Sequence, residues 1–180
     1  MDNKEIELKF LISENTKKEI LNDIEKCGKK TNESRLIDTY YIPNFKSFEV
    51  NGETAECLRI RESNGNCVLG YKKIHREADP VYCDEYETKI ESKEQTEKIL
   101  FALGFSTQMV IDKTRLSYKY KDLLFDFDSV KNLGEILEVE LTDNSKDVND
   151  IFEFVKKYNL TKKDVTYEGI QMLMKKNQNI

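Results

Sequence analysis

The segment Glu5-Ile6-Glu7-Leu8-Lys9 alternates charged and aliphatic side chains, and six later segments repeat this alternation. In a β-strand, successive side chains point to opposite faces of the sheet. Each segment therefore predicts a strand with one charged face and one mostly apolar or neutral face. The later segments are Leu58-Arg59-Ile60-Arg61, Tyr71-Lys72, Glu85-Tyr86-Glu87, Lys113-Thr114-Arg115, Asp126-Phe127-Asp128 and Glu138-Val139-Glu140.

Two plainer interpretations compete with a functional one. Residues 5–9 alone could form an exposed helix with a Glu-to-Lys pair at i,i+4. Single pairs on strands could lie on a solvated face, where cross-strand ion pairs contribute roughly 0.2–1 kcal/mol each. Neither explains the repetition on strand after strand. A sheet curled with these faces inward would instead form a polar tunnel.

The remaining pattern predicts an antiparallel α+β domain spanning residues 1–180. Ser63-Asn64-Gly65-Asn66 is a hairpin turn signal. Helices are predicted after the N-cap residues Ser13 and Ser92, over residues 148–158, and from Thr166. Strands are predicted over residues 4–12, 34–41, 56–62, 67–74, 81–90, 108–120, 123–130 and 135–141. The helices are expected to cover the apolar strand faces, which include Ile6, Leu8, Phe10, Phe125, Phe127, Val139 and Leu141.

Composition argues against several functional classes. The net charge of −5 and the pI of about 5.2 disfavour a nucleic-acid-binding surface. Neither a signal-type stretch after Met1-Asp2-Asn3-Lys4 nor a membrane-length apolar window is evident, so a cytoplasmic protein is expected. A zinc site or a Cys-His nucleophile pair is disfavoured, because His75 is the single histidine and no C-x-x-C motif joins the four cysteines, Cys27, Cys57, Cys67 and Cys83.

The mixture of charges on the strands suggests a polyphosphate ligand. Buried cations are unfavourable unless they are paired or liganded, and phosphate oxygens accept bonds from both guanidinium and ammonium groups. The carboxylates suit Mg²⁺ or Mn²⁺, which prefer oxygen ligands and bridge protein to phosphate. The six cations concerned are Lys9, Arg59, Arg61, Lys72, Lys113 and Arg115.

These residues resemble the CYTH superfamily, also called triphosphate tunnel metalloenzymes. Residues 5–9 match the N-terminal E-x-E-x-K signature of that superfamily, and further blocks follow in the same order over nearly the whole chain. They are Asp38-Thr39-Tyr40-Tyr41, Leu58-Arg59-Ile60-Arg61-Glu62, Tyr71-Lys72, Glu85-Tyr86-Glu87, Asp112-Lys113-Thr114-Arg115, residues 128–134 and Leu137-Glu138-Val139-Glu140. The resemblance implies an eight-stranded antiparallel closed barrel with a charged interior and helices outside.

The resemblance also implies roles for individual residues. Metal ligands are expected at Glu5, Glu7, Glu138 and Glu140. Phosphate contacts are expected at Lys9, Arg61, Lys72, Lys113 and Arg115, with Arg59 as an additional contact. Asp128 resembles a position near the reacting centre, so the expected catalytic residues are Lys9, Lys113, Arg115 and Asp128. Glu85 and Glu87 could bind metal, position water or neutralise neighbouring arginines.

Two reactions remain open at this point. The blocks look closest to class IV adenylyl cyclases, which convert ATP to cyclic AMP and pyrophosphate and are compatible with a homodimer. Hydrolysis of tripolyphosphate, thiamine triphosphate or a nucleoside triphosphate is the alternative. A third hypothesis, a non-catalytic polyphosphate or nucleotide sensor, is disfavoured because the expected metal-binding carboxylates are present.

Overall fold

The computed structural model describes residues 4–143 and 146–178, so Met1-Asp2-Asn3 lies outside the described residues. The chain forms two compact units. Unit 1 contains residues 35–112 and 168–178, and unit 2 contains residues 4–34, 113–143 and 146–167. Two long strands contribute residues to both units, β3 (Lys29–Pro43) and β9 (Phe105–Tyr120). That the chain forms a single domain over residues 1–180 stays a prediction.

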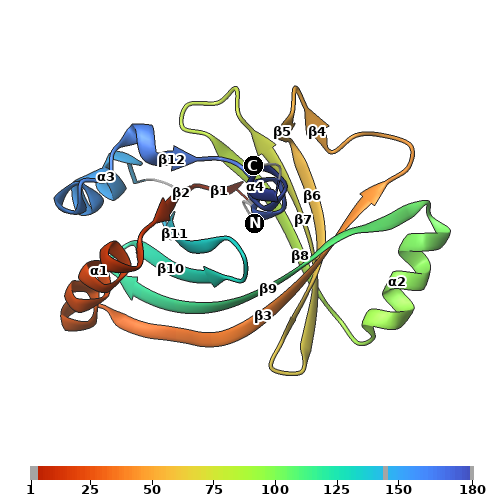
Figure 1. The fold of residues 1–180 in the computed structure, drawn as a ribbon, viewed down its shortest axis with the longest axis horizontal. Coiled ribbons are helices and arrows are strands. Elements are labelled where there is room, and N and C mark those ends of the chain that lie inside the picture. The colour runs from red at the N-terminus through yellow and green to blue at the C-terminus, as the bar shows by residue number, and fades with distance from the viewer. Residues whose placement is uncertain (1–3, 144–145, 179–180) are drawn as a thin grey trace. The chain divides into compact units, whose positions relative to one another are not determined.

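The elements follow the order shown in Figure 1. The other strands are β1 (Lys4–Glu5), β2 (Glu7–Ile12), β4 (Glu49–Val50), β5 (Glu53–Thr54), β6 (Glu56–Ser63), β7 (Asn66–His75), β8 (Tyr82–Ile90), β10 (Leu123–Val130), β11 (Gly134–Leu141) and β12 (Val165–Thr166). The helices are α1 (Glu14–Cys27), α2 (Lys93–Ala102), α3 (Asn149–Val155) and α4 (Ile170–Gln178), with 3₁₀ turns η1 (Lys156–Tyr158) and η2 (Lys162–Asp164).

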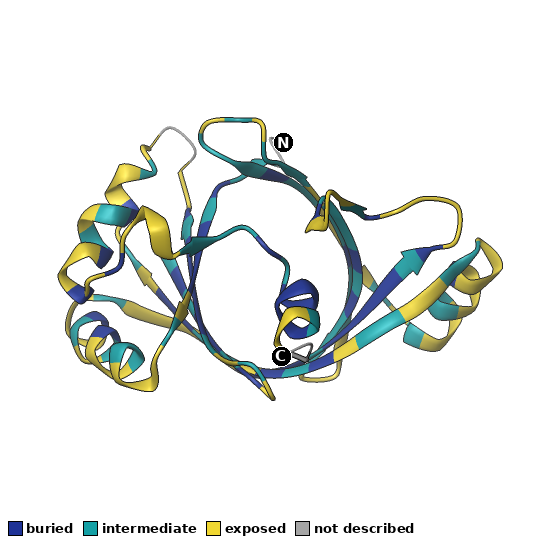
Figure 2. Cartoon of the chain, turned by 45° about the horizontal axis from the view of Figure 1, so that its top comes forward, coloured by how far each residue is buried: buried dark blue, intermediate teal, exposed yellow. Residues whose placement is uncertain are grey.

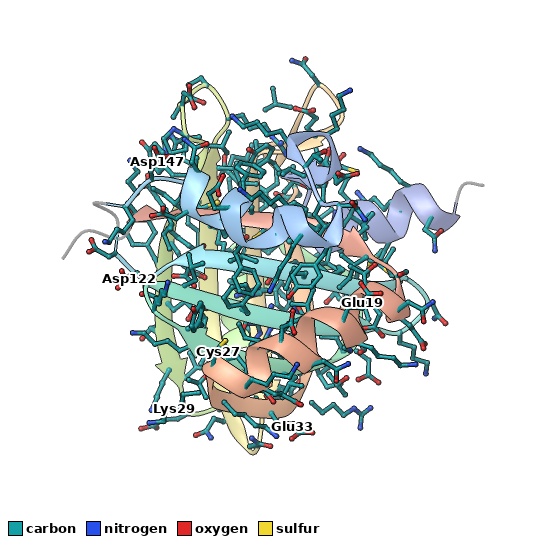
Figure 3. All side chains as sticks on the ribbon, turned by 90° about the vertical axis from the view of Figure 1, so that its left-hand side faces the viewer. Glu19, Cys27, Lys29, Glu33, Asp122 and Asp147 are labelled. Carbon is teal, nitrogen blue, oxygen red and sulfur yellow. The ribbon has the colours of Figure 1, made fainter. Side chains whose placement is uncertain are left out.

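In unit 2, β9, β10, β11 and β2 pair in antiparallel order. The predicted apolar faces are buried, with both Phe10 and Phe125 at 0% exposure. Figure 3 shows α1 and α3 on the same side of these strands. Helix α1 buries Ile20 and Ile24, and the ring of Phe154 in α3 lies 4.6 Å from that of Phe125. The prediction that helices cover the apolar face is therefore confirmed for unit 2.

In unit 1, β3, β6, β7 and β8 also pair in antiparallel order. The predicted turn between β6 and β7 is present, with Asn64 and Gly65 both at positive φ, 49° and 77°. Two such residues in a row are typical of the two-residue hairpin turn that matches strand twist. The small hairpin of β4 and β5 was not predicted, since the sequence there indicates only a loop.

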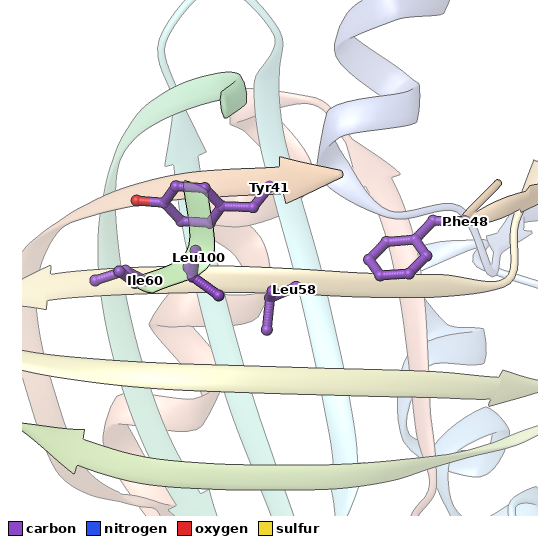
Figure 4. Close-up of a cluster of buried hydrophobic side chains, with 5 residues drawn as sticks. All are labelled: Tyr41, Phe48, Leu58, Ile60 and Leu100. Carbon is purple, nitrogen blue, oxygen red and sulfur yellow. The ribbon is translucent and has the colours of Figure 1, made fainter. Parts of the chain in front are cut away.

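The core of unit 1 lies between the strands and α2. Figure 4 shows Leu100 of α2 beside Tyr41 of β3 and the strand residues Leu58 and Ile60. Ser92 caps α2 as predicted, because its Oγ accepts a hydrogen bond from the Gln95 amide at 3.2 Å. The helices combine buried and exposed residues in Figure 2, whereas α4 is buried over five consecutive residues, 170–174.

The prediction of a closed, eight-stranded barrel is wrong in strand number and in closure. The main sheet has ten strands, and its hydrogen-bonding order has two end strands, β1 and β12, within the described residues. The predicted first strand is interrupted at Ile6, which separates β1 from β2. In addition, β12 pairs with β2 at Phe10 and Lys9, and so occupies an edge of β2.

The predicted start of the last helix at Thr166 is also wrong. Thr166 belongs to β12 and pairs with Lys9, so its backbone is extended rather than helical. The helix begins four residues later, at Ile170. Within residues 4–143 and 146–178, no helix has the length and apolar character needed to cross a membrane.

Candidate functional site

The charged face of unit 2 is built by neighbouring residues on four strands. Lys9 of β2 lies opposite Glu138 of β11, which in turn lies opposite Asp126 of β10. Asp128 lies opposite Arg115 of β9. Because alternate residues of a strand share a face, these charged side chains lie on one side of the sheet and the buried apolar residues on the other.

Arg115 contacts three carboxylates of this face. Its Nε and Nη2 donate to the two oxygens of Asp128, each at 2.6 Å. Nη2 also donates to Glu138, and Nη1 donates to Asp126. Burial alone would lower the pKa of Arg115, but the surrounding carboxylates, above all Asp128, raise it well above its usual value. The guanidinium therefore keeps its charge in this buried position.

Lys113 and Asp128 form a buried ion pair. The Lys113 Nζ lies 2.5 Å from Asp128 Oδ2, and the side chains are 1% and 0% exposed. Burial raises the pKa of Asp128, but the charges of Arg115 and Lys113 outweigh burial and lower it below the usual value. The Asp128 carboxylate thus holds both cations in place.

Lys9 extends this network to Glu7, a second predicted metal ligand besides Glu138. Its Nζ lies 3.1 Å from Glu138 and 3.5 Å from Glu7. Glu140 lies opposite Glu7 in the strand register. Glu5 is half-buried in β1, on the other side of the interruption at Ile6. The contacts of Lys9, Lys113 and Arg115 link three cations to four carboxylates.

The resemblance implies a divalent metal, and the residues of unit 2 fit one. Among the described residues, no group of three or more His, Cys, Asp or Glu side chains is assembled around a common point, because Lys9 and Arg115 hold several of the carboxylates. However, Oδ1 of Asp126 is buried and has no hydrogen-bond partner within the described part of the chain. Burial raises the pKa of Asp126, while the charge of Arg115 acts against this rise. A cation at Oδ1 would satisfy the oxygen and offset the excess negative charge.

Unit 1 carries a second charged cluster, on β3, β6, β7 and β8. Arg61 binds Asp38 through two parallel hydrogen bonds, from Nε at 2.7 Å and from Nη2 at 2.8 Å. Asp38 is 0% exposed. This two-point contact fixes the plane of the guanidinium, which a single hydrogen bond would leave free to rotate.

Arg59 and Lys72 share the carboxylates of β8. Arg59 Nη2 lies 3.3 Å from Glu87 and 3.6 Å from Glu85, and Lys72 Nζ lies 3.3 Å from Glu85. Of the three roles considered for Glu85 and Glu87, the structure shows the neutralising contacts. Gly70 lies between Arg59 and Glu87 in register, and a Cβ there would lie 3.1 Å from the Glu87 carboxylate. The missing side chain leaves room for the two charged ones.

His75, the single histidine of the chain, lies among acidic side chains of unit 1. It ends β7 with a side chain only 17% exposed, and its Nε2 lies 2.8 Å from Asp84. Nδ1 lies 3.2 Å from Glu77, and the ring stacks on Tyr82 at 4.5 Å. The register of β7 with β8, which places His75 opposite Tyr82, draws the side chain to the sheet.

These contacts give a testable pH dependence. The hydrogen bond to Asp84 is the main cause that raises the pKa of His75. Stability from this contact should be fully present below pH 6.5 or so, the usual histidine pKa, and be lost as pH rises through the raised value. NMR titration of the single histidine should give a pKa above about 6.5, and Asp84→Asn should lower it. Glu77→Gln, at the other acidic neighbour of His75, serves as the comparison variant. A His75 pKa that is unchanged in Asp84→Asn would contradict the prediction.

Three residues at the clusters had no predicted role, namely Asp38, Gly70 and Asp126. Asp126 shares the charged face with Asp128, so the alternation of residues 126–128 contained the signal. Asp38 belongs to the segment Asp38-Thr39-Tyr40-Tyr41, which resembles the family, but its partner Arg61 is 23 residues away in the sequence. Only the pairing of β3 with β6 identifies that partner. A glycine within an alternating strand was the signal for Gly70.

Comparison with known proteins gives consistent matches. The CYTH domain model matches residues 3–168. A protein of Methanocaldococcus jannaschii that carries the provisional name adenylate cyclase is 30% identical over 167 residues, which cover 89% of this chain and 93% of the relative.

Solved structures share the fold at lower identity. The PH1012 protein of Pyrococcus horikoshii superposes with a TM-score of 0.77 at 22% identity, covering 94% of this chain and 99% of that one. A Hippeastrum protein, provisionally named an adenylyl cyclase and described as having a dominant triphosphatase activity, gives a TM-score of 0.62 at 15% identity, with 92% and 90% coverage.

Proposed function

This chain belongs to the CYTH domain family, and from that premise we propose that it is a metal-dependent enzyme acting on triphosphate substrates. The observation that supports this most directly is the cluster of unit 2, where Arg115, Lys113 and Lys9 lie among carboxylates on one sheet face. Phosphate oxygens are natural ligands of such cations, and a divalent ion is a natural ligand of such acids.

We propose ATP as the substrate, with cyclic AMP and pyrophosphate as products. The oxygen of the ribose 3′-hydroxyl attacks the α-phosphorus and forms a new phosphorus–oxygen bond. The bond from the α-phosphorus to the oxygen that bridges to the β-phosphate breaks, the hydroxyl proton is transferred to solvent, and pyrophosphate leaves. The name carried by the Methanocaldococcus jannaschii relative supports this choice.

Different residues of unit 2 have different proposed roles in this reaction. Lys9 and Arg115 bind phosphate oxygens and offset the charge that builds up on the departing pyrophosphate. Asp128 and Lys113 are positioning residues in the structure as it stands, since both are buried and Asp128 fixes the guanidinium of Arg115. A phosphate contact for Lys113 remains a prediction from the family resemblance. The same holds for Arg59, Arg61 and Lys72 of unit 1.

Glu5, Glu7, Glu138 and Glu140 are the residues that would hold Mg²⁺ or Mn²⁺. The bound ion would supply a lowered pKa at the attacking hydroxyl and positive charge beside the phosphates. In the structure, Lys9 contacts two of these carboxylates, Glu7 and Glu138. Lys9 thereby keeps them close to the position of the phosphate that it is expected to bind.

Hydrolysis of a triphosphate is the second candidate. Water would attack the terminal phosphorus instead, and the same cations would stabilise the leaving diphosphate. The Hippeastrum protein supports this candidate, because its dominant activity is that of a triphosphatase on a similar fold.

One assay separates these functions. The full-length protein is incubated with Mg²⁺ or Mn²⁺ and either ATP or inorganic tripolyphosphate, and cyclic AMP, pyrophosphate and orthophosphate are measured. We expect metal-dependent cyclic AMP and pyrophosphate in equal amounts from ATP. Orthophosphate from tripolyphosphate without cyclic AMP from ATP would identify a triphosphatase. Binding of both compounds without any product would overturn the enzyme proposal in favour of a sensor.

A further inference from the structure

The two arginines of β6 in the charged cluster of unit 1 are held in different ways. Arg61 donates two hydrogen bonds to Asp38, at 2.7 and 2.8 Å, and Asp38 is 0% exposed. Arg59 Nη2 lies 3.3 Å from Glu87 Oε1 and 3.6 Å from Glu85 Oε1. Hydrogen bonds between charged groups normally measure about 2.7–2.9 Å. The contacts of Arg59 are therefore long and weak, whereas Arg61 is fixed in place.

Glu87 reaches Arg59 across the strand that lies between them. Gly70 of β7 is opposite Arg59 on one side and opposite Glu87 on the other. A Cβ at Gly70 would lie 3.1 Å from Glu87 Oε1 and 3.7 Å from Arg59 Nε, so the two side chains meet above the glycine. The Glu87 side chain is 43% exposed, while that of Arg59 is 12% exposed. Glu87 is thus free to rotate into water, where its carboxylate regains full hydration.

A phosphate group at Arg59 would bring further negative charge to this cluster. Among the four side chains concerned, the charges of Arg59 and Lys72 already balance those of Glu85 and Glu87. A carboxylate that stayed beside the phosphate would repel it. Glu85 contacts both cations, at 3.6 and 3.3 Å, and its side chain is only 22% exposed. Glu87 is therefore the carboxylate that loses less by moving away.

We propose that Glu87 is an exchangeable counter-ion of Arg59, which occupies the place of a substrate phosphate and rotates into solvent when the substrate binds. This inference rests on the proposed function, because it takes Arg59 to be a phosphate contact. It selects one of the roles that the sequence left open for Glu87 and gives that role a sign, since the carboxylate competes with the substrate. A metal ligand or a residue that positions water would instead support binding or turnover.

Binding of inorganic tripolyphosphate tests this exchange without turnover. Isothermal titration calorimetry uses the full-length protein in EDTA, as wild type, as Glu87→Gln and as the matched control Glu94→Gln. Glu94 lies in α2 with a side chain 75% exposed and pairs with Lys98. We expect Glu87→Gln to bind tripolyphosphate about two- to fivefold more tightly than wild type, the scale set by an exposed ion pair. Glu94→Gln, which removes the same charge elsewhere, should bind as wild type does.

A double variant shows whether Glu87 acts through Arg59. Arg59→Gln should weaken tripolyphosphate binding, and in that background Glu87→Gln should no longer improve it, because the contact between the two side chains is already gone. A gain of the same size with and without Arg59 would indicate a general effect of charge and would overturn the inference. The melting temperature of Glu87→Gln should stay close to that of wild type, because an exposed pair contributes little to stability.

The remaining outcomes separate this inference from the proposed function. Weaker or unchanged tripolyphosphate binding in Glu87→Gln would overturn the inference, as would the absence of saturable binding in wild type. Turnover by wild type with Mg²⁺ or Mn²⁺, together with unchanged affinity in Glu87→Gln, would leave the proposed function standing without this role for Glu87. Tighter binding in Glu87→Gln, but no product from ATP or tripolyphosphate, would support the inference and overturn the proposal of an enzyme.

Discussion

Glu138→Ala should abolish turnover of triphosphate substrates while the protein stays folded. Glu138 is a predicted metal ligand and also contacts Lys9 and Arg115, so its removal affects both the metal and the phosphate-binding cations. Removing one group that stabilises charge in a transition state lowers kcat by on the order of a hundred- to a thousandfold. Because Glu138 combines two such roles, we expect the upper end of this range or more.

The fold should survive this change for a structural reason. Arg115 keeps its contacts with Asp126 and Asp128 when Glu138 is removed. Circular dichroism and thermal melting check the fold, and steady-state assays with ATP and tripolyphosphate measure kcat. Lys9→Ala should behave similarly, since it removes the cation between Glu7 and Glu138.

Glu153→Ala is the matched control for Glu138→Ala. Glu153 is a glutamate of α3 with a side chain 69% exposed, paired with Lys156. Its replacement should leave kcat and the melting temperature close to those of wild type. Full activity in Glu138→Ala or in Lys9→Ala would remove that residue from the mechanism.

Asp128→Ala should destabilise the fold, by roughly 3–5 kcal/mol in the free energy of unfolding, the range seen when one partner of a buried ion pair is removed. Asp128 is 0% exposed and contacts both Lys113 and Arg115. Without its carboxylate, these two cations lie next to each other in a buried position with their shared counter-ion gone. Urea unfolding at neutral pH measures the loss.

The double variant Asp128→Ala with Lys113→Met tests whether the buried charge causes this loss. Replacing both partners removes the ion that would otherwise lack its carboxylate, so the double variant should be more stable than Asp128→Ala alone. Equal stability of the two would show that packing, rather than charge, dominates at this site.

Acid pH provides a second check on Asp128. Its pKa is lowered in the folded protein, because Arg115 and Lys113 outweigh the effect of burial. Its contribution to stability is therefore fully present above the usual aspartate pKa of about 3.9 and is lost as pH falls through the lower folded value. The stability difference between wild type and Asp128→Ala should shrink accordingly in acid.

Local patterns predicted most of the strands and the way they are oriented. The alternation in residues 126–128 and 138–140 places charges on one face and Phe127 and Val139 on the other, and both apolar residues are buried as predicted. The turn at Asn64 and Gly65 could be predicted because a two-residue hairpin turn needs positive φ, which asparagine and glycine tolerate. These features depend on neighbours in the chain, so a single sequence contains them.

The same local patterns failed where distant segments decide the structure. The local sequence predicts that a helix starts at Thr166, but Thr166 pairs with Lys9 and is therefore part of a strand. The same pairing occupies an edge of β2. The interruption at Ile6 is likewise invisible in the alternation, which continues through it.

The sequence by itself determined the family, the charged and apolar faces of the strands, and the residue types available for binding phosphate and metal. Only the tertiary structure decided which charges meet: that Arg115 joins Asp126, Asp128 and Glu138, and that Asp38 fixes Arg61. The reason is physical. The face of a side chain follows from the two-residue repeat of its own strand, whereas its partner depends on the register between strands, which many residues distant in sequence set together.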